Sequence, residues 1–206
     1  MKEYTTITKT ETVVENVIEK SRFITSAIGV ESVEEAMEFV NAKRKKYFDA
    51  THNCFAYIVG DRAKFSDDGE PQGTAGMPIY ECIKNNGLDR LCVVVTRYFG
   101  GIKLGAGGLV RAYSGGTADV LSKAERLKMT DCIRANAVVD YNLLSIVKRA
   151  LSGVCLVENV VYSDKVTLQC LFPATEYATI ADIVTQNTLG KGIFTQVDRL
   201  LCPYKA

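Results

Sequence analysis

The sequence of 206 residues contains no tryptophan, four prolines and only one histidine. A single histidine excludes metal sites that need two histidine ligands. No uninterrupted apolar run is long enough to cross a bilayer, and no basic segment followed by an apolar one opens the chain. We therefore expect a soluble, cytoplasmic protein with no membrane partner.

An excess of charge of one sign is also lacking. The 25 Lys and Arg residues nearly balance the 24 Asp and Glu residues, so the formal net charge is +1. No overall field therefore draws this chain to nucleic acid, and any such attraction must come from a local patch of cations.

The seven cysteines include no C-x-x-C pair, which argues against a zinc site or a thiol redox motif. Most of them stand among apolar residues, where free cysteine behaves as a small core side chain. We expect reduced, packed thiols rather than a disulfide framework at Cys54, Cys82, Cys92, Cys155 and Cys170.

Glycine is unusually concentrated in one stretch. Seven of the sixteen glycines lie between Gly100 and Gly116, in a run that passes from a β-branched strand through a tight loop into a predicted helix. The only charged side chains from residue 91 to 116 are the cations Arg97, Lys103 and Arg111.

A strand that delivers a glycine-rich loop to a helix start leaves backbone N–H groups free, and these favour an anion. Gly105, Gly107 and Gly108 would form this cradle. The alternative is that the glycines only allow the helix to pack closely on a sheet. The run has no GK[ST] ending and lacks the last glycine of a dinucleotide fingerprint, so no nucleotide cofactor is predicted.

Four other polar residues suggest a second chemistry. Asp67, Asp68 and Glu70 could bind a divalent cation or act as acid and base, and His52 could be a base. The alternatives are a solvated, mobile acidic turn, a structural histidine, or acids that meet the cations of the glycine-rich loop. No nucleophile, base and orienting group can be assembled from spacing alone, so a binding role is favoured over an enzyme.

Hydrophobic periodicity predicts an α+β fold with an N-terminal domain over residues 1–131. Its elements would be a hairpin over 10–28, a helix over 33–46, a strand over 53–59, a surface loop over 60–76, a helix over 77–86, then the central strand and a helix to about Lys128. Ser32 and Glu35 form a capping-box pattern at the first helix. The basic run at its end, 43–46, is interpreted as a solvated helix terminus.

A second domain is predicted over residues 135–206. Strands over 137–141, 156–162, 165–172 and 194–201, with helices over 142–151 and 176–188, give the order β-α-β-β-α-β, which is ferredoxin-like. This region has no histidine and no cluster of cations, so we expect an accessory or assembly role.

Four motifs in this order resemble a known family. They are KSRF (20–23), ATHNCFAY (50–57), DDGEPQGTAG (67–76) and VVVTRYFGGIKLGAGGLVRAY (93–113). With them the chain resembles the Impact/YigZ family, and residues beyond 135 resemble the smaller C-terminal domain of its bacterial members.

This resemblance implies an N-terminal domain similar to domain 2 of ribosomal protein S5 and to a domain of elongation factor G. It also implies a ferredoxin-like C-terminal domain and a role in the regulation of translation. Eukaryotic relatives restrain the amino-acid-starvation kinase through an additional N-terminal domain, which we do not expect in this protein. Some bacterial relatives are labelled proline dipeptidases, which the single histidine argues against.

The function predicted from these observations is recognition of RNA, the ribosome or another phosphate-bearing partner. Arg97, Lys103 and Arg111 would contact phosphate, and Tyr98, Phe99 or Tyr113 would stack on bases. The alternatives are a regulator that binds a translation-associated protein, or a metal- or phosphate-dependent enzyme that uses His52 and the acidic loop.

Overall fold

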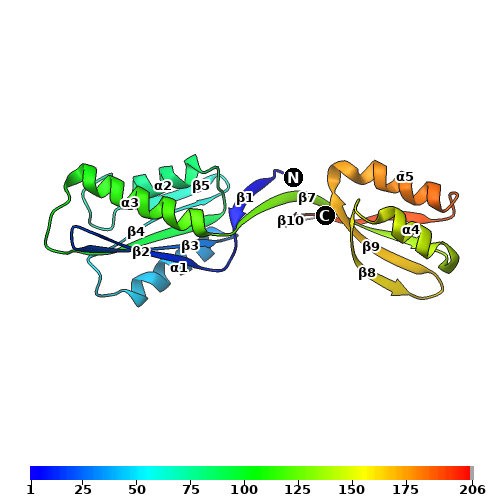
Figure 1. The fold of residues 1–206 in the computed structure, drawn as a ribbon, viewed down its shortest axis with the longest axis horizontal. Helices are drawn as coiled ribbons and strands as arrows, with labels where there is room; N and C mark the ends of the chain where they lie inside the picture. Colours follow the sequence, from blue (N-terminus) through cyan, green and yellow to red (C-terminus); the bar gives the residue numbers. More distant parts are fainter. Residues whose placement is uncertain (205–206) are drawn as a thin grey trace. The chain divides into compact units, whose positions relative to one another are not determined.

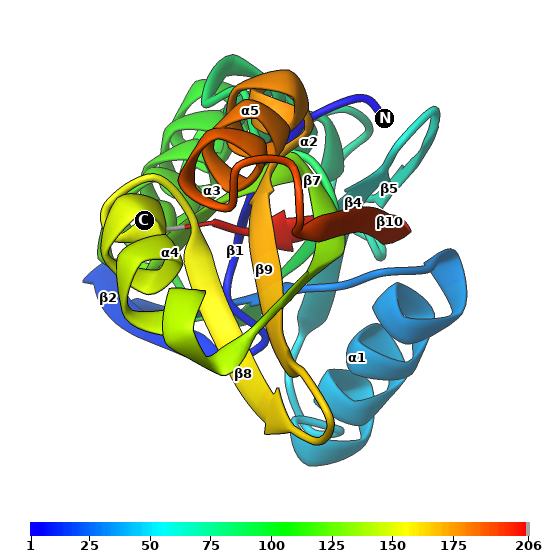
Figure 2. The same cartoon turned by 90° about the vertical axis from the view of Figure 1, so that its right-hand side faces the viewer.

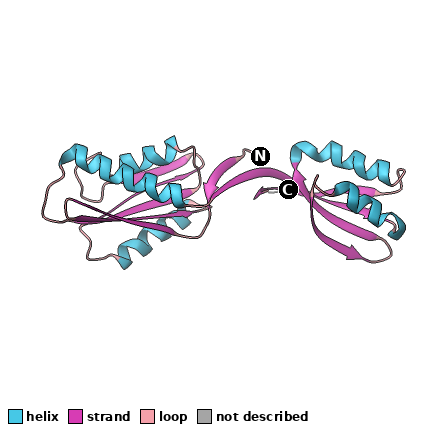
Figure 3. Cartoon of the chain, viewed as in Figure 1, coloured by secondary structure: helices cyan, strands magenta, loops and turns pink. Residues whose placement is uncertain are grey.

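The computed structural model describes residues 1–204 of the chain, which form two compact units (Figure 1). The N-terminal unit is Thr5–Leu127, and the C-terminal unit is residues 1–4 together with the chain from Lys128 onward. Each unit is built on an antiparallel sheet with helices against it, which confirms the predicted α+β class. The predicted boundary at 131–135 lies inside one continuous strand, β7 (Arg126–Val139) (Figure 3).

The sheet of the N-terminal unit has the strand order β2-β3-β6-β4-β5. Its strands are β2 (Thr12–Ile18), β3 (Ser21–Gly29), β6 (Leu91–Tyr98), β4 (His52–Val59) and β5 (Arg62–Ser66). The predicted hairpin is confirmed, and Glu19 and Lys20 at its tip have the positive φ values of a two-residue turn. The prediction of a loop over 60–76 is wrong for the residues that form the edge strand β5. This strand is exposed along most of its length, so it lacks the apolar alternation from which strands are predicted.

Three helices cover the two faces of this sheet. α1 (Val33–Lys46) packs on β4 and β6 from one face, while α2 (Gly76–Asn85) and α3 (Gly105–Lys123) pack on the other (Figure 1). The predicted Ser32 cap is confirmed, because Ser32 Oγ accepts from the Glu35 N–H at 3.1 Å, while the Glu35 carboxylate accepts from the Glu31 N–H at 2.8 Å rather than closing the capping box. α3 ends at Lys123 rather than near Lys128, since the residues that follow alternate in burial as part of β7.

The basic end of α1 also differs from its interpretation as a solvated terminus. Lys43 is buried and its ammonium bonds the Glu11 carboxylate, and Arg44 pairs with Asp68 at 2.8 Å. Only Lys45 and Lys46 of this run are exposed. Two of the four cations thus stabilise the unit itself.

The C-terminal unit has the predicted element order β-α-β-β-α-β. The elements are β7, α4 (Leu144–Leu151), β8 (Leu156–Tyr162), β9 (Val166–Pro173), α5 (Tyr177–Asn187) and β10 (Ile193–Pro203), with short 3-10 turns before each helix. The strand order is β10-β7-β9-β8, and β1 (Tyr4–Ile7), which the sequence did not predict, also pairs with β7. The strand predicted to reach Tyr141 ends at Val139. α4 and α5 contact each other, and Figure 2 shows them side by side.

Of the five cysteines predicted to be packed, Cys82 is half-buried and the others are buried. All seven cysteines are free thiols, and burial raises the pKa of the Cys92 thiol well above its usual range. No helix within residues 1–204 is both long and apolar enough for a bilayer span.

The glycine pair in α3 provides a test of helix packing. A Cβ at Gly116 would lie 2.7 Å from the buried Thr25 Oγ1, whereas nothing lies within 4 Å of a Cβ at Gly115. We expect Gly116→Ala to lower the free energy of unfolding by about 1–3 kcal/mol and Gly115→Ala to raise it by about 0.5–1 kcal/mol. Urea denaturation of both variants checks this, and effects of the same sign would contradict the packing described.

Candidate functional site

The site begins where β6 ends and the loop 99–104 turns into α3. This loop packs against the tip of the β2–β3 hairpin, where the Gly100 N–H donates to Ser21 Oγ at 3.2 Å. The approach is so close that a Cβ at Gly100 would lie 2.0 Å from the Lys20 carbonyl carbon. The KSRF motif and the glycine-rich loop are therefore in direct contact.

Arg97 lies beneath this loop and is almost completely buried, with 6% of its side chain exposed. Its Nη1 donates to Glu70 Oε1 at 2.7 Å and its Nη2 donates to Ser21 Oγ at 3.3 Å. The guanidinium carbon lies 5.4 Å from the ring centroids of both Phe23 and Phe99, at cation–π distance. Packing, charge and hydrogen bonds thus fix Arg97 in one place.

Glu70 is the centre of a buried polar network. Only 3% of its side chain is exposed, and its Oε1 accepts a second hydrogen bond at 2.7 Å from the Tyr113 hydroxyl. His52 Nε2 lies 3.8 Å from Oε2, and Cys54 Sγ donates to the Tyr113 hydroxyl at 3.4 Å. Burial raises the pKa of Tyr113, which keeps its phenol protonated as a donor. The predicted contact between the acidic loop and a cation of the loop region is confirmed for Glu70 and Arg97.

The other two acids have separate partners. The Asp67 carboxylate accepts from the N–H groups of Gly73, Ala75 and Gly76 at 2.8–3.0 Å, at the start of α2. The Asp68 carboxylate accepts from Arg44 and, at 2.7 Å, from the Asn53 N–H. Across residues 1–204 no group of three or more His, Cys, Asp and Glu side chains is placed to hold a metal ion.

His52 is positioned by the same loop. Its Nδ1 lies 2.9 Å from the Asp68 carbonyl oxygen, which accepts a hydrogen bond when this nitrogen is protonated. The side chain is 18% exposed. His52 therefore connects the acidic loop to β4, and its other ring nitrogen turns toward Glu70.

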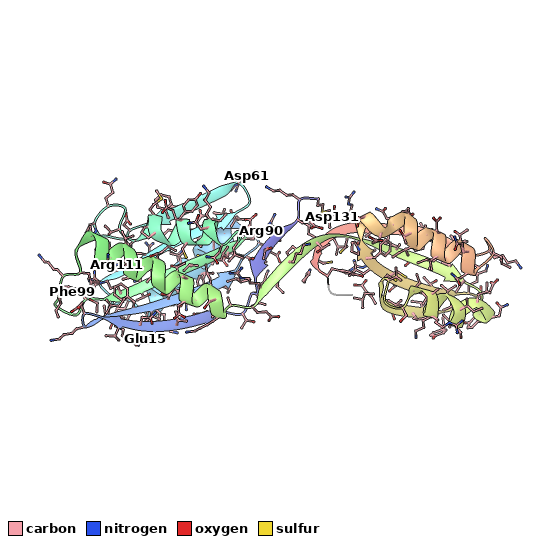
Figure 4. The ribbon with its side chains drawn as sticks, turned by 45° about the horizontal axis from the view of Figure 1, so that its top comes forward. Glu15, Asp61, Arg90, Phe99, Arg111 and Asp131 are labelled. Atoms are coloured by element: carbon pink, nitrogen blue, oxygen red, sulfur yellow. The ribbon has the colours of Figure 1, made fainter. Side chains whose placement is uncertain are left out.

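Two neighbouring hollows flank the start of α3. The first, which we call the Phe99 pocket, has a volume of about 360 Å³ and is lined by Glu70, Pro71, Arg97, Phe99, Lys103, Leu104, Gly105, Ala106 and Leu109. The second, the Arg111 pocket, has a volume of about 410 Å³ and is lined by Ile18, Glu19, Ile102, Lys103, Leu104, Gly108, Arg111 and Ala112. Lys103 and Leu104 belong to both, and Figure 4 shows Phe99 and Arg111 at the same end of the N-terminal unit.

The start of α3 is electropositive. Leu104 supplies no side-chain cap and the first turn has no acidic residue, so its leading N–H groups keep the partial positive charge of a helix start. The Arg111 Nη1 lies 3.6 Å from the position of a Cβ on Gly107, so the guanidinium folds back along the helix. In the described part of the chain, neither Lys103 nor Arg111 has an ion pair.

Some of the residues predicted to contact a partner are exposed, and others already form hydrogen bonds within the chain. Lys103 and Arg111 are exposed, and Gly105, Gly107 and Gly108 form the first turn of α3. Tyr98 is half-buried and donates its hydroxyl hydrogen bond to Asp49 at 2.8 Å.

The structure changes the predicted roles of Tyr113 and Ser21. Tyr113 is a candidate for stacking on a base by sequence, but it is fully buried and cannot reach a partner. Ser21, which accepts from both Arg97 and Gly100, is not predicted as a site residue. The signal that could have identified it is its place in the KSRF motif.

Comparison with known proteins identifies the family whose sequences match the residues of this site. The family model described as Impact N-terminal domain matches residues 19–121, which include all the residues of the two pockets from Glu19 to Ala112 and most of the N-terminal unit. IMPACT family member YvyE of Bacillus subtilis is 39% identical over 181 residues, covering 86% of this chain and 83% of YvyE. The chain belongs to the Impact family.

A second relative and a solved structure are similar to this chain over most of their lengths. IMPACT family member YigZ of Escherichia coli is 39% identical over 174 residues, covering 81% of this chain and 84% of YigZ. A solved structure titled as the crystal structure of an hypothetical protein has 31% identity and a TM-score of 0.62, and covers 96% of this chain and 98% of its own. The resemblance based on the four motifs is thus confirmed.

Proposed function

We propose that this Impact-family protein is a translation-linked factor that binds single-stranded RNA at the start of α3. The observation that carries the proposal is the uncapped first turn of α3 between two unpaired cations, Lys103 and Arg111. Backbone N–H groups at a helix start and nearby cations together favour phosphate oxygens.

A stacking surface next to this cationic site supports RNA over a free anion. Phe99 is 46% exposed and lines the pocket that adjoins the Arg111 pocket through Lys103. Single-strand binding commonly combines a positive groove with aromatic side chains on which bases stack. We propose that the protein acts in the cytoplasm and at the ribosome, because the chain resembles regulators of translation.

An enzymatic role receives less support from the same geometry. The Asp67 carboxylate accepts hydrogen bonds from backbone N–H groups, and the Asp68 carboxylate pairs with Arg44. Glu70 neutralises Arg97. Each acid that suggested catalysis therefore already stabilises a neighbouring element.

Reversing both exposed cations tests the proposal. We expect Lys103→Glu with Arg111→Glu to weaken binding of a labelled single-stranded RNA by about tenfold or more, because attraction to phosphate is replaced by repulsion. The slope of log affinity against log salt should also fall by about 0.7 for each phosphate that the protein no longer neutralises. Fluorescence anisotropy at several salt concentrations measures both quantities.

The matched control is Arg62→Glu with Lys64→Glu on the exposed edge strand β5, which changes the net charge equally. This control should retain most of the affinity if the site is local. Equal reductions in both double variants, or none in the first, would overturn the proposal.

A further inference from the structure

Phe48 is an unusually exposed aromatic residue. It lies two positions after the end of α1, in the loop 47–51, and 84% of the residue is exposed. Phenylalanine is among the residue types that are most often buried. Among the large hydrophobic residues that the structure describes, only Leu189 is more exposed. The N-terminal unit therefore leaves this aromatic side chain largely uncovered.

Two cations precede Phe48 at the end of α1. Lys45 and Lys46 are exposed, and within residues 1–204 neither of them has an ion pair. Cations at a helix C-terminus offset the helix dipole, but Lys43 and Arg44 of the same turn already supply such charge. Lys45 and Lys46 are therefore available to neutralise a partner.

The loop that carries Phe48 is bonded to the segment that begins the glycine-rich loop. The Phe99 N–H donates to Thr51 Oγ1 at 3.0 Å, and the Tyr98 hydroxyl donates to Asp49 at 2.8 Å. Asp49 is the only acid of the loop 47–51. Because Phe48 adjoins Asp49 and Phe99 adjoins Tyr98 along the chain, both phenylalanines lie at the same end of the sheet.

The two phenylalanines belong to opposite sides of the sheet. Phe48 follows α1, which covers one face, and Phe99 precedes α3, which covers the other. Tyr98 joins them, and the Arg22 guanidinium carbon lies 5.7 Å from its ring centroid. Figure 4 shows Phe99 at the same end as Arg111. Aromatic and cationic side chains thus continue from the start of α3 around the end of the sheet to α1.

We infer that Phe48, Lys45 and Lys46, which we call the Phe48 surface, form a second contact for the RNA strand that binds at the start of α3. This inference rests on the proposed function. One base stacks on Phe48, and the two lysines neutralise phosphates beside it. A single strand fits because it offers bases and phosphates repeatedly along its length, and stacking with phosphate contacts accepts any base. The bound strand is therefore several nucleotides long and of no fixed sequence.

The dependence of affinity on RNA length tests this second contact. We measure binding of labelled oligouridine to the full chain by fluorescence anisotropy, with strands from about 3 to about 12 nucleotides. Phe48→Ala should weaken binding of the longest strand by about fivefold or more, and leave binding of the shortest strand unchanged, because only the longer strand reaches both contacts. The same dependence on length in both proteins would overturn the inference.

Three further variants assign the effect to stacking at this position. Phe48→Tyr retains the ring and should bind the longest strand as the unchanged protein does. Phe48→Leu keeps an apolar side chain without a ring and should lose as much affinity as Phe48→Ala. Tyr162→Ala is the control on the C-terminal unit, where the residue is 62% exposed, and we expect no loss. Full affinity in Phe48→Leu, or an equal loss in Tyr162→Ala, would contradict stacking on Phe48.

Lys45→Gln with Lys46→Gln tests the phosphate contacts. Glutamine avoids the repulsion that an acidic side chain meets at a helix C-terminus. For the longest strand, we expect the slope of log affinity against log salt to fall by about 0.7 for each phosphate that loses its cation. The matched control, Arg62→Gln with Lys64→Gln on β5, should leave the slope unchanged. An unchanged slope in the Lys45 and Lys46 variant would overturn the role of these lysines.

The two proposals fail in different ways. If the Lys103 and Arg111 reversals weaken binding of every strand but Phe48→Ala weakens none, the second contact is wrong and the site at α3 stands. If Phe48→Ala weakens binding but the reversals do not, the Phe48 surface stands and the site at α3 is wrong. Binding to anionic lipid vesicles that Phe48→Ala abolishes, with no change for RNA, would assign this surface to a membrane and overturn the inference.

Discussion

Glu70→Ala is expected to lower the free energy of unfolding of the N-terminal unit by about 3–5 kcal/mol. The substitution leaves the Arg97 guanidinium, with 6% of its side chain exposed, without its charge partner, and it also removes the acceptor of the Tyr113 hydroxyl. Native-state hydrogen exchange of the β6 amides gives the opening free energy of this unit without a signal from the other one.

The control for this change is Glu15→Ala. Glu15 forms a bidentate pair with Arg22, with N···O distances of 2.6 and 2.9 Å, but the side chains are 45% and 50% exposed. Solvent screens this pair, so we expect little or no decrease in the free energy of unfolding. Similar decreases at Glu15 and Glu70 would mean that burial of the Glu70 pair does not govern its contribution.

Gly100→Ala is expected to lower the free energy of unfolding by about 3 kcal/mol, at the upper end of the effects of overpacking. Its Cβ would approach the carbonyl of Lys20 and the nitrogen of Ser21 to within 2.0–2.4 Å. These are backbone atoms, so no side-chain rotation relieves the overlap, and the loop must separate from the hairpin. Urea denaturation measures the decrease, and binding of labelled RNA should weaken with it because Glu19 on that hairpin lines the Arg111 pocket.

Gly107→Ala is the comparison for this effect. The nearest atom to its Cβ would be Arg111 Nη1 at 3.6 Å, an ordinary contact with the end of a flexible side chain. Alanine is favoured over glycine in a helix by about 1 kcal/mol, so this variant should be neutral or stabilised. A Gly100 variant as stable as the Gly107 variant would show that the close packing of the loop on the hairpin is not required.

Much of the fold follows from local patterns. The β2–β3 hairpin, the Ser32 cap and the β-α-β-β-α-β order are predictable because each is encoded by neighbouring residues. β5 escapes prediction because an exposed edge strand gives no alternating apolar signal, and the predicted end of α3 is misplaced because charged residues continue into β7.

The site is less accessible to sequence reasoning. Composition alone locates the glycine-rich loop and its cations, since both are local features. The burial and pairing of Arg97 depend on Glu70, which is 27 positions away along the chain. Glu70 reaches Arg97 only through the packing of a loop over the sheet. The burial of Tyr113 likewise depends on which side of α3 faces the core, and glycines on that helix make its apolar stripe hard to define.

The segment from Asp67 to Glu70 has a consequence beyond its individual contacts. Asp67 holds the start of α2, Asp68 holds the end of α1, and Glu70 holds the end of β6 through Arg97. Three elements are thus attached to four consecutive positions, so the spacing of the side chains matters as much as their charge. Surface connections usually accept insertions, but one extra residue here would shift at least one carboxylate away from its partner. We expect chain length in this segment to be invariant even where the neighbouring turns differ in length.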